Sequence, residues 1–245
     1  MQAQWLAAFD DARLTALVEE ALRNNPDLMA SAARVQQAAA YVESASAQLK
    51  PQLNAIGNFS GKGTSSGGLN YGGGFASWEL DVWGRVRAGR EAAQLQLLSA
   101  ALANRYARQS LAAMVARAWF LAAEARLQKG LADEMVTSAE TLVRVAGERM
   151  RVGNGNDYDV AVAKAGLANY RDVAEQADLA LRQSVQAIET LVGRYPAAEL
   201  EVPAALPALP GPVPAGIPSE LLERRPDVVA AERRVAAAFY RVEEA

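Results

Sequence analysis

The chain has 245 residues, and its 25 lysines and arginines against 28 aspartates and glutamates leave a net charge near −3. It contains no cysteine and no histidine, which excludes disulfides, cysteine nucleophiles, zinc clusters and histidine-based acid–base chemistry. Arginine is spread through the expected helices and is not gathered on one face, so we expect no nucleic-acid partner. We also expect no catalytic residue, cofactor or metal.

The sequence carries no clear signal for export or for a membrane helix. Its first residues do not read as a signal peptide, because no basic segment precedes an apolar one. The best candidate for a membrane helix, residues 111–123, is interrupted by Arg117. If the protein meets a membrane, we expect it to do so through strands, with an export signal missing from this sequence.

Two helices are expected before the first strand. Residues 10–24 are amphipathic, with apolar residues at Leu14, Leu17, Val18, Ala21 and Leu22. This helix ends at Asn25, because the residue before a proline is pushed out of the α region. Pro26 is well placed in the first turn of the next helix, which we expect to run to about residue 49 and to stop at Pro51.

A two-stranded hairpin is predicted next, with a flexible tip at the glycine-rich residues 61–68. Its first strand, 51–59, alternates apolar and polar residues with Ile56 as the exception, and its second is expected to run from 71 to about 82. The apolar face would hold Leu53, Ala55, Gly57 and Phe59 of the first strand and Ala76, Trp78, Leu80 and Val82 of the second. Phe75, Ser77, Glu79 and Asp81 would face the other side.

This hairpin has two possible settings. It suits a wall with lipid on one side and water on the other, standing on a helical base. The alternative is a small hairpin lying on a helical bundle. An isolated hairpin is marginal in water, so we expect it to pair with something else, such as neighbouring subunits.

A very long helix is predicted over residues 85–152, at about 100 Å by the standard rise. Its second half repeats every seven residues, which specifies a left-handed supercoil, and alanine at the seam lets a partner helix approach closely. The seam residues are Leu111, Ala118, Ala125, Ala132, Ala139 and Ala146, with companions at Met114, Leu121, Gln128, Met135 and Leu142.

The partner helix is expected to follow directly. Gly153, Asn154, Gly155 and Asn156 read as a turn, in which Asn156 caps a helix that runs to about residue 192. That helix also repeats in sevens, at Val160, Leu167, Ala174, Leu181 and Ile188. We therefore predict an antiparallel coiled-coil hairpin. The lengths would let the helix before the β-hairpin and the one after the turn stack end to end beside the long helix, as a stave of about 100 Å.

An internal repeat is visible at an offset of 200 residues. Residues 20–30 align with 220–230, and the match continues from Arg34–Val35 to Arg234–Val235. A proline-rich, semi-rigid connector separates the two copies at about 194–218. The first 200 residues thus read as one repeat unit, and we expect a complete protein to continue into a second hairpin and a second helical pair.

Three motifs carry a family resemblance. They are SWELDVWGRVR at 77–87, RVG at 151–153 followed by YDV at 158–160, and LERRPDVVAAERR at 222–234. With residues 54–59, these resemble the TolC-type outer-membrane efflux channels, especially their lipoprotein branch. The resemblance covers essentially the whole chain. It implies a mainly helical fold with a small β part, and a homotrimer in which each complete protomer gives four strands to a twelve-stranded barrel.

The resemblance also implies a location and a role. The protein would be a passive duct in the outer membrane, in contact with its lipid, and would export drugs or other small solutes. It would dock onto a periplasmic adaptor and an inner-membrane pump. The implied domains are 1–25 (an N-terminal equatorial helix), 26–50 with 85–193 (the periplasmic α-barrel), 51–84 (the membrane hairpin), 194–218 (the connector) and 219–245 (a truncated second repeat).

This sequence departs from the family pattern in three ways. Compared with the family pattern, we expect the signal peptide and the lipidated N-terminal cysteine to be missing from this sequence, together with two strands and two long helices per protomer. The family's main periplasmic gate residues lie largely in that missing half, so none is carried over.

Candidate sites lie at the two ends of the long helix. Glu79, Asp81, Arg85 and Arg87 sit at the barrel-to-helix junction, where salt bridges are favoured over an acid–base pair of carboxylates. Trp78 and Trp83 are interpreted as membrane-interface aromatics in preference to core residues. Gly153, Asn154, Gly155 and Asn156 form at least a tight turn, which the resemblance makes the adaptor-docking tip.

A second function class stays open at this point. The alternative to a duct is a soluble or periplasmic coiled-coil adaptor that uses its long helical hairpin as a docking arm. Adaptors flank such a hairpin with compact β-domains, whereas here a single amphipathic β-hairpin interrupts the helices. An enzyme is the least favoured of the three classes.

Overall fold

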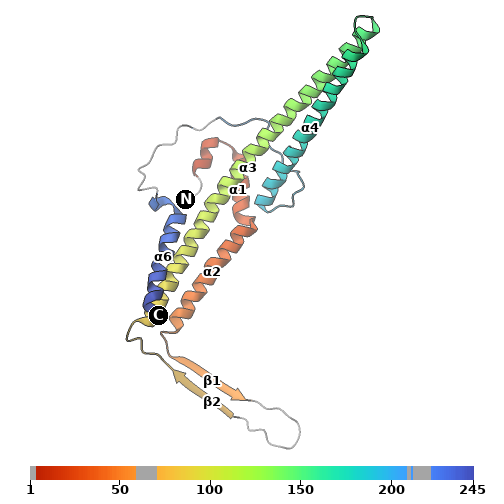
Figure 1. The fold of residues 1–245 in the computed structure, drawn as a ribbon. Helices are drawn as coiled ribbons and strands as arrows, with labels where there is room; N and C mark the ends of the chain where they lie inside the picture. The colour runs from red at the N-terminus through yellow and green to blue at the C-terminus, as the bar shows by residue number, and fades with distance from the viewer. Residues whose placement is uncertain (1–3, 59–70, 209–210, 212–221) are drawn as a thin grey trace, which may run out of the picture. The chain divides into compact units, whose positions relative to one another are not determined.

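A computed structural model describes residues 4–58, 71–208, 211 and 222–245. Figure 1 shows its elements. They are η1 (Gln4–Phe9), α1 (Ala12–Asn24), α2 (Pro26–Ala47), β1 (Gln52–Asn58), β2 (Tyr71–Ser77), α3 (Arg85–Arg151), α4 (Asp157–Val192) and α6 (Pro226–Glu244). The prediction of a mainly helical chain with one β-hairpin is confirmed. Within the described residues, no helix is both long and apolar enough to cross a bilayer.

The chain divides into two compact units. The first comprises Met1–Pro26 with Arg108–Pro214, and the second comprises Asp27–Ala107 with Ala215–Ala245. Helix α3 contributes to both, and its 67 residues make it about 100 Å long. The predicted stacking of α2 and α4 end to end involves both units and stays a prediction.

In the first unit, α1 packs against the middle of α3 and the end of α4. Asp11 caps α1, because its Oδ1 accepts hydrogen bonds from the backbone N–H groups of Arg13 (2.9 Å) and Leu14 (3.0 Å). Its Oδ2 accepts another from Nε1 of Trp119, at 2.8 Å. The buried apolar residues here are Leu14, Leu17, Val18 and Ala21 of α1, Val115, Trp119, Ala122 and Ala123 of α3, and Val185, Ile188 and Val192 of α4.

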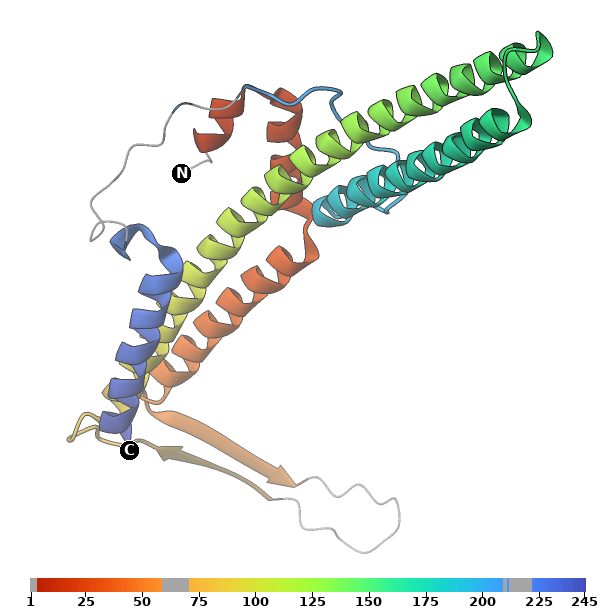
Figure 2. The same ribbon diagram turned by 45° about the horizontal axis from the view of Figure 1, so that its top comes forward.

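Beyond this core, α3 and α4 continue side by side as an antiparallel pair (Figure 2). Ala132 and Ala139 of α3 and Ala163 of α4 are buried, and Glu140 pairs with Arg171 across the two helices at 2.9 Å. The predicted coiled-coil hairpin is therefore confirmed. The companion positions were expected to share its seam but stay open to solvent: Met114, Leu121, Met135 and Leu142 are 39–59% exposed. Two helices close only one seam, and these larger side chains lie at its rim.

In the second unit, α2 and α6 both contact the first part of α3. Nδ2 of Asn104 donates a hydrogen bond to Oγ of Ser31 in α2, at 3.1 Å. Oγ of Ser99, which is buried, donates to the carbonyl of Ala230 in α6, at 2.8 Å. Helices α2 and α6 begin at Pro26 and Pro226, so the two copies of the sequence repeat form the same local structure.

The β-hairpin has the predicted alternation, with Ile56 and Phe75 as apolar residues on the face of Asn54, and a shorter second strand. The two strands pair antiparallel from Gln52 opposite Ser77 to Asn58 opposite Tyr71. Leu53 is opposite Ala76, so the two lie on the same face, as expected. Phe59 and the predicted tip at 61–68 lie outside the described residues.

The prediction that the second strand continues to residue 82 is wrong, since β2 ends at Ser77. The reason is the partner strand, which begins at Gln52 directly after Pro51 and offers no pairing beyond that point. The backbone instead turns, with the N–H of Val82 donating to the carbonyl of Leu80 at 2.8 Å. The carboxylates of Glu79 and Asp81, which lie in this turn, bind residues at the start of α3.

Candidate functional site

The link between β2 and α3 is held by acidic side chains on the start of the helix. Oδ1 of Asp81 accepts from the backbone N–H of Val86 at 3.1 Å, and Oδ2 accepts from the N–H of Arg87 at 3.0 Å. These donors lie in the first turn of α3, where helix N–H groups have no partner within the helix and favour a carboxylate. Asp81 therefore fixes where α3 begins.

Two ion pairs complete this junction. The guanidinium of Arg85 binds the carboxylate of Glu79, with Nη2 at 2.8 and 2.9 Å from its two oxygens, and Nε of Arg87 lies 3.0 Å from Oδ2 of Asp81. The structure thus brings the four predicted junction residues together as two pairs. Both carboxylates are taken up by arginines, which leaves neither arranged as the free acid of a two-carboxylate catalyst.

The two predicted interface tryptophans differ in how they are held. Nε1 of Trp78 donates a hydrogen bond to the carbonyl of Leu49 at 3.2 Å, so this ring bridges the end of β2 and the end of α2. Trp83 is 95% exposed. Neither ring belongs to the core, which contradicts the alternative that they are core residues. Their contact with a membrane interface stays a prediction.

The turn between α3 and α4 is short and well satisfied. Gly153 adopts a left-handed φ of 79°, as is usual after a helix C-terminus. Its N–H donates to the carbonyl of Met150 at 3.1 Å, and that of Asn154 donates to Arg149 at 2.8 Å. Oδ1 of Asn156 accepts from the N–H of Asp159 at 2.8 Å, which confirms that Asn156 caps α4.

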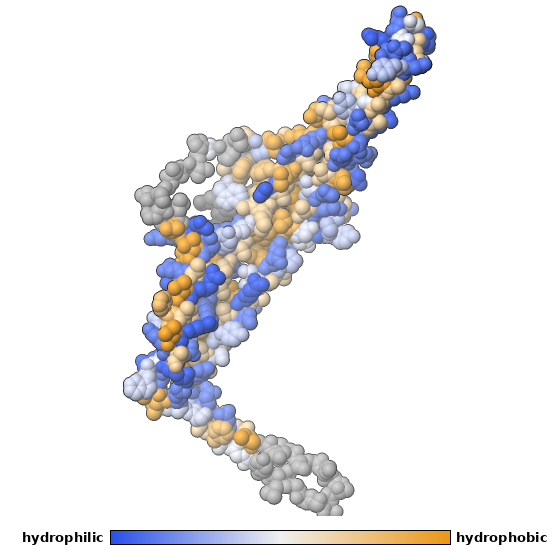
Figure 3. Space-filling view, viewed as in Figure 1, coloured by the Kyte–Doolittle hydropathy of each residue, from blue (hydrophilic) through white to orange (hydrophobic). Residues whose placement is uncertain are grey.

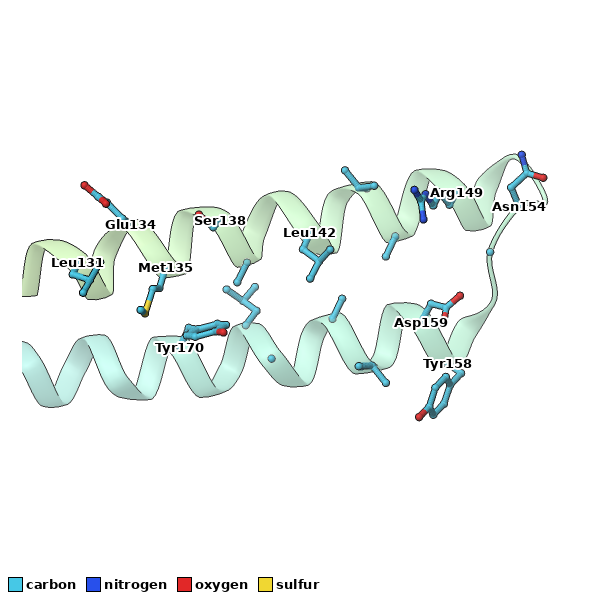
Figure 4. Close-up of a pocket in the computed structure, with 18 residues that line it drawn as sticks. Leu131, Glu134, Met135, Ser138, Leu142, Arg149, Asn154, Tyr158, Asp159 and Tyr170 are labelled. Atoms are coloured by element: carbon cyan, nitrogen blue, oxygen red, sulfur yellow. The ribbon is translucent and has the colours of Figure 1, made fainter.

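An apolar groove of about 1000 Å³ lies between α3 and α4 next to this turn. Figure 4 shows that Met135, Leu142 and Tyr170 point into the space between the helices, whereas Tyr158 points away. Ala139, Ala146, Ala163 and Gly166 supply the small residues of the groove. This groove was not predicted from the sequence, although the apolar companion positions of the heptad were a signal for it.

Charges around the turn follow the helix dipoles. Arg149 and Arg151 occupy the last turn of α3, and Asp157 and Asp159 occupy the first turn of α4. Cations are favoured at a helix C-terminus and anions at an N-terminus. The turn therefore presents basic and acidic side chains side by side, next to the apolar groove. Among the described residues, no group of acidic side chains could hold a metal ion.

Comparisons with known proteins show what this chain is similar to. A sequence model of the outer membrane efflux protein family matches residues 17–194. The chain is 30% identical over 249 residues to the cation efflux system protein CusC of Escherichia coli, covering 96% of this chain and 53% of that protein. It is 32% identical over 260 residues to the pyoverdine export outer membrane protein OpmQ of Pseudomonas aeruginosa, again covering 96% and 53%. The chain spans about half the length of the curated relatives it matches.

Solved structures of outer-membrane channels are similar to this chain as well. The outer-membrane channel OprN superposes with a TM-score of 0.82 at 29% sequence identity, covering 98% of this chain and 56% of that one. A structure of CusC superposes with a TM-score of 0.80 at 27% identity, covering 96% and 56%. The helices and the hairpin described above therefore have the fold of TolC-type helical channels.

Proposed function

The chain belongs to the outer membrane efflux protein family, and from that premise we propose that it forms part of an outer-membrane duct through which drugs or other small solutes leave the cell passively. The family is one of efflux channels and not of enzymes. The observation that carries the proposal is the β-hairpin, where Leu53 is 85% exposed on the face that holds Ala76. An exposed apolar face on a hairpin that Asp81 links to the start of α3 suits a strand pair in lipid on a helical base.

In this proposal, the hairpin crosses the outer membrane. Leu53, Ala55 and Ala76 face lipid, and Gln52, Asn54 and Ser77 face water, in keeping with their alternation along the paired strands. Trp78 and Trp83 lie where the strands leave the hydrocarbon, and aromatic rings are enriched at that depth. Their exposure on the surface supports this placement.

We propose that the complete protein is a homotrimer whose hairpins join in one barrel. Among the described residues the sheet has only two strands, so one edge of each strand has no partner there. In lipid every backbone polar group needs a hydrogen bond. Apolar surface on α6 also favours neighbours; Figure 3 shows this hydrophobic edge. Its exposed residues include Val235, Phe239 and Val242. Neighbouring repeats and subunits would cover both features.

The opposite end of α3 is the proposed docking point for a periplasmic adaptor, which links the duct to an inner-membrane pump. The turn at Gly153, Asn154, Gly155 and Asn156 is small and rigidly capped. The paired charges beside it and the apolar groove behind it offer both polar and apolar contacts to a helical partner.

The membrane placement is tested by labelling the hairpin. The chain has no cysteine, so single cysteines at Leu53 and Asn54 give unique labelling positions on adjacent, opposite-facing residues. In outer-membrane vesicles, a label at position 53 should be quenched by a lipid-embedded quencher and one at 54 by a water-soluble quencher. Equal quenching of both labels by the water-soluble reagent would contradict the proposal.

The docking proposal is tested separately by cross-linking at the turn. A photoreactive group placed at Tyr158, which is 74% exposed, should trap a periplasmic adaptor in intact cells. The same group at the exposed Arg117, in the middle of α3 and away from the turn, is the matched control and should trap none. Cross-links from Arg117 but not from Tyr158 would move the docking surface away from the turn.

A further inference from the structure

The turn between α3 and α4 holds the only asparagine of the chain that is followed by glycine, Asn154–Gly155. Asparagine side chains are chemically labile. The reaction begins when the backbone nitrogen of the next residue attacks the side-chain amide carbon. A following glycine makes this attack easiest, because it has no Cβ to hinder the approach and allows the most backbone freedom.

The structure leaves the Asn154 side chain open to that attack. Asn154 is exposed, and in Figure 4 its amide points away from both helices at the end of the turn. Within the described part of the chain, no hydrogen bond reaches this amide; only the backbone N–H of Asn154 is engaged, by the carbonyl of Arg149. The side chain is therefore free to turn toward the nitrogen of Gly155.

Asn156, two residues later, provides the contrast. Its Oδ1 accepts the N–H of Asp159 as the cap of α4, which holds the amide in place. It is followed by Asp157, whose side chain crowds the attacking nitrogen. One turn thus contains one free asparagine before a glycine and one fixed asparagine before a larger residue.

The glycine at 155 is required by the turn itself. A Cβ at this position would lie 3.0 Å from the backbone nitrogen of Met150 and 3.2 Å from the backbone carbon of Arg149. Both are backbone atoms of the last turn of α3, so they could not move aside without distorting the helix end. The close approach of the turn to the end of α3 therefore favours at position 155 the residue that makes Asn154 labile.

We propose that Asn154 is a site of spontaneous deamidation. The backbone nitrogen of Gly155 forms a bond to Cγ of Asn154 and loses its proton, while the Cγ–Nδ2 bond breaks and ammonia leaves. Water then opens the cyclic imide at either carbonyl. One product is aspartate at position 154, and the other is isoaspartate, in which the chain continues through the side-chain carboxyl.

The product changes the turn. It adds a negative charge beside Asp157 and Asp159, and the isoaspartate form also lengthens the backbone where the turn is tightest. Asn154 is one of the residues beside the groove between α3 and α4, so the new charge lies near the groove, at the outer end of the turn. If the turn docks an adaptor, which rests on the function proposed above, deamidation would alter that contact as the protein ages.

Peptide mapping by mass spectrometry tests the modification without reference to function. The folded chain is held in mildly alkaline buffer at physiological temperature, and the amide-to-acid mass change is followed at each asparagine over time. The same chain unfolded in urea gives the rate of conversion in the absence of structure. The Asn154→Gln variant is the negative control, because its longer side chain would have to form a larger ring. Chromatographic separation distinguishes aspartate from isoaspartate.

We expect Asn154 to convert faster in the folded chain than any other asparagine, with both acid products present, and Asn156 to stay intact. Conversion in urea but none at Asn154 in the folded chain would overturn the proposal, because the turn would then protect the site. Equal rates at Asn154 and Asn156 would also overturn it. Binding of an adaptor to the Asn154→Asp variant is a separate measurement, so failure of the docking proposal leaves this result unaffected.

Discussion

The paired helices α3 and α4 behave differently at their two ends. Where α1 covers them, a region we call the root (residues 111–126 and 185–192), Trp119 is 1% exposed and Ile188 is fully buried. Near the turn, in what we call the arm (131–151 and 157–170), Leu142 is 59% exposed and Tyr170 is 43% exposed. The same seven-residue pattern thus forms a closed core at one end and an open groove at the other.

The difference comes from the number of elements that meet. At the root, Leu14 and Val18 of α1 cover the side chains that α3 and α4 leave open, so large residues are enclosed. In the arm, only two helices meet among the described residues, and two helices enclose little beyond the small residues of their seam. A heptad pattern therefore specifies a pairing direction, but a third element decides whether the pairing makes a core.

The root also contains a buried charged side chain, Glu189. The buried carboxylate of Glu189 accepts the N–H groups of Ala198 and Glu199 at 2.8 Å and of Leu200 at 3.1 Å. Ala198 has a left-handed φ of 59°, which is disfavoured for a residue with a Cβ. Arg126 of α3 donates to the carbonyl of Val202. The start of the connector is thereby tied to α4 and α3.

The strongest test of this comparison is removal of the root's largest buried side chain. Trp119→Ala should lower the free energy of unfolding by about 3–5 kcal/mol, because it opens a cavity and leaves Asp11 without its indole donor. Urea unfolding followed by circular dichroism measures the loss. Leu142→Ala in the arm is the control and should cost only about 0.5 kcal/mol. Similar losses would show that the arm is closed in solution.

The next largest effect is expected at the connector. Glu189→Ala leaves three partly exposed backbone N–H groups without their acceptor. Because water can replace part of the lost bonding, the total loss should be about 1–3 kcal/mol. Hydrogen exchange at Ala198, Glu199 and Leu200 should accelerate, while exchange in the arm should stay unchanged. Glu175→Ala, at an exposed position of α4, should change neither. Unaltered protection of these three amides would exclude Glu189 as the anchor.

The seam of the arm can be tested by adding volume. Ala132 is buried and Glu134, two residues later, is exposed. Ala132→Leu should destabilise the pair by about 1–3 kcal/mol through overpacking, whereas Glu134→Leu should have almost no effect. Melting temperatures report the difference. Equal values for the two variants would mean that the wrong face of α3 has been assigned to the seam.

The smallest expected effect concerns an ion pair and its pH dependence. Arg194, just after α4, binds Glu20 of α1 next to the root, with N–O distances of 2.6 and 2.7 Å. The hydrogen bond from Arg194 outweighs the opposing effect of burial and holds the pKa of the Glu20 carboxyl below its usual value. The stabilisation is therefore complete above the unfolded-state pKa and is lost as the pH falls through the lower folded-state pKa.

Glu20→Gln should accordingly lower stability by up to about 1 kcal/mol at neutral pH and by nothing once the pH lies below the folded-state pKa of Glu20. Unfolding curves across the acidic range measure this convergence. Glu140→Gln breaks the more exposed pair with Arg171 in the arm and should change stability little at any pH. A constant difference between Glu20→Gln and the unmodified chain at all pH values would contradict the assignment.

Helix positions were largely predictable from the sequence because their signals are local. Pro26 and Pro51 bracket α2, and Asn156 caps α4, so each boundary follows from residues within a turn of it. The seven-residue alanine repeat likewise predicted which face of α3 meets α4. The repeat at an offset of 200 predicted that α6 would begin as α2 does, and both start at proline.

Features that depend on distant residues were not predictable in the same way. The end of β2 at Ser77 is set by where its partner begins, 25 residues earlier at Gln52. The role of Glu189 was missed because a glutamate on a helix usually lies in solvent, and nothing nearby in sequence indicates that the connector folds back over it. Junction residues Glu79, Asp81, Arg85 and Arg87 were predicted because their partners lie six residues apart.

The sequence by itself determined the elements, their order and the face that each helix presents, because propensity, capping and periodicity act over a few residues. Tertiary structure decided which of those faces are enclosed. Trp119 and Leu142 are both apolar residues on one helix, and α1 buries the first while leaving the second open. Enclosure depends on a third element brought from about 100 residues away, and no local pattern on α3 records where that element will pack.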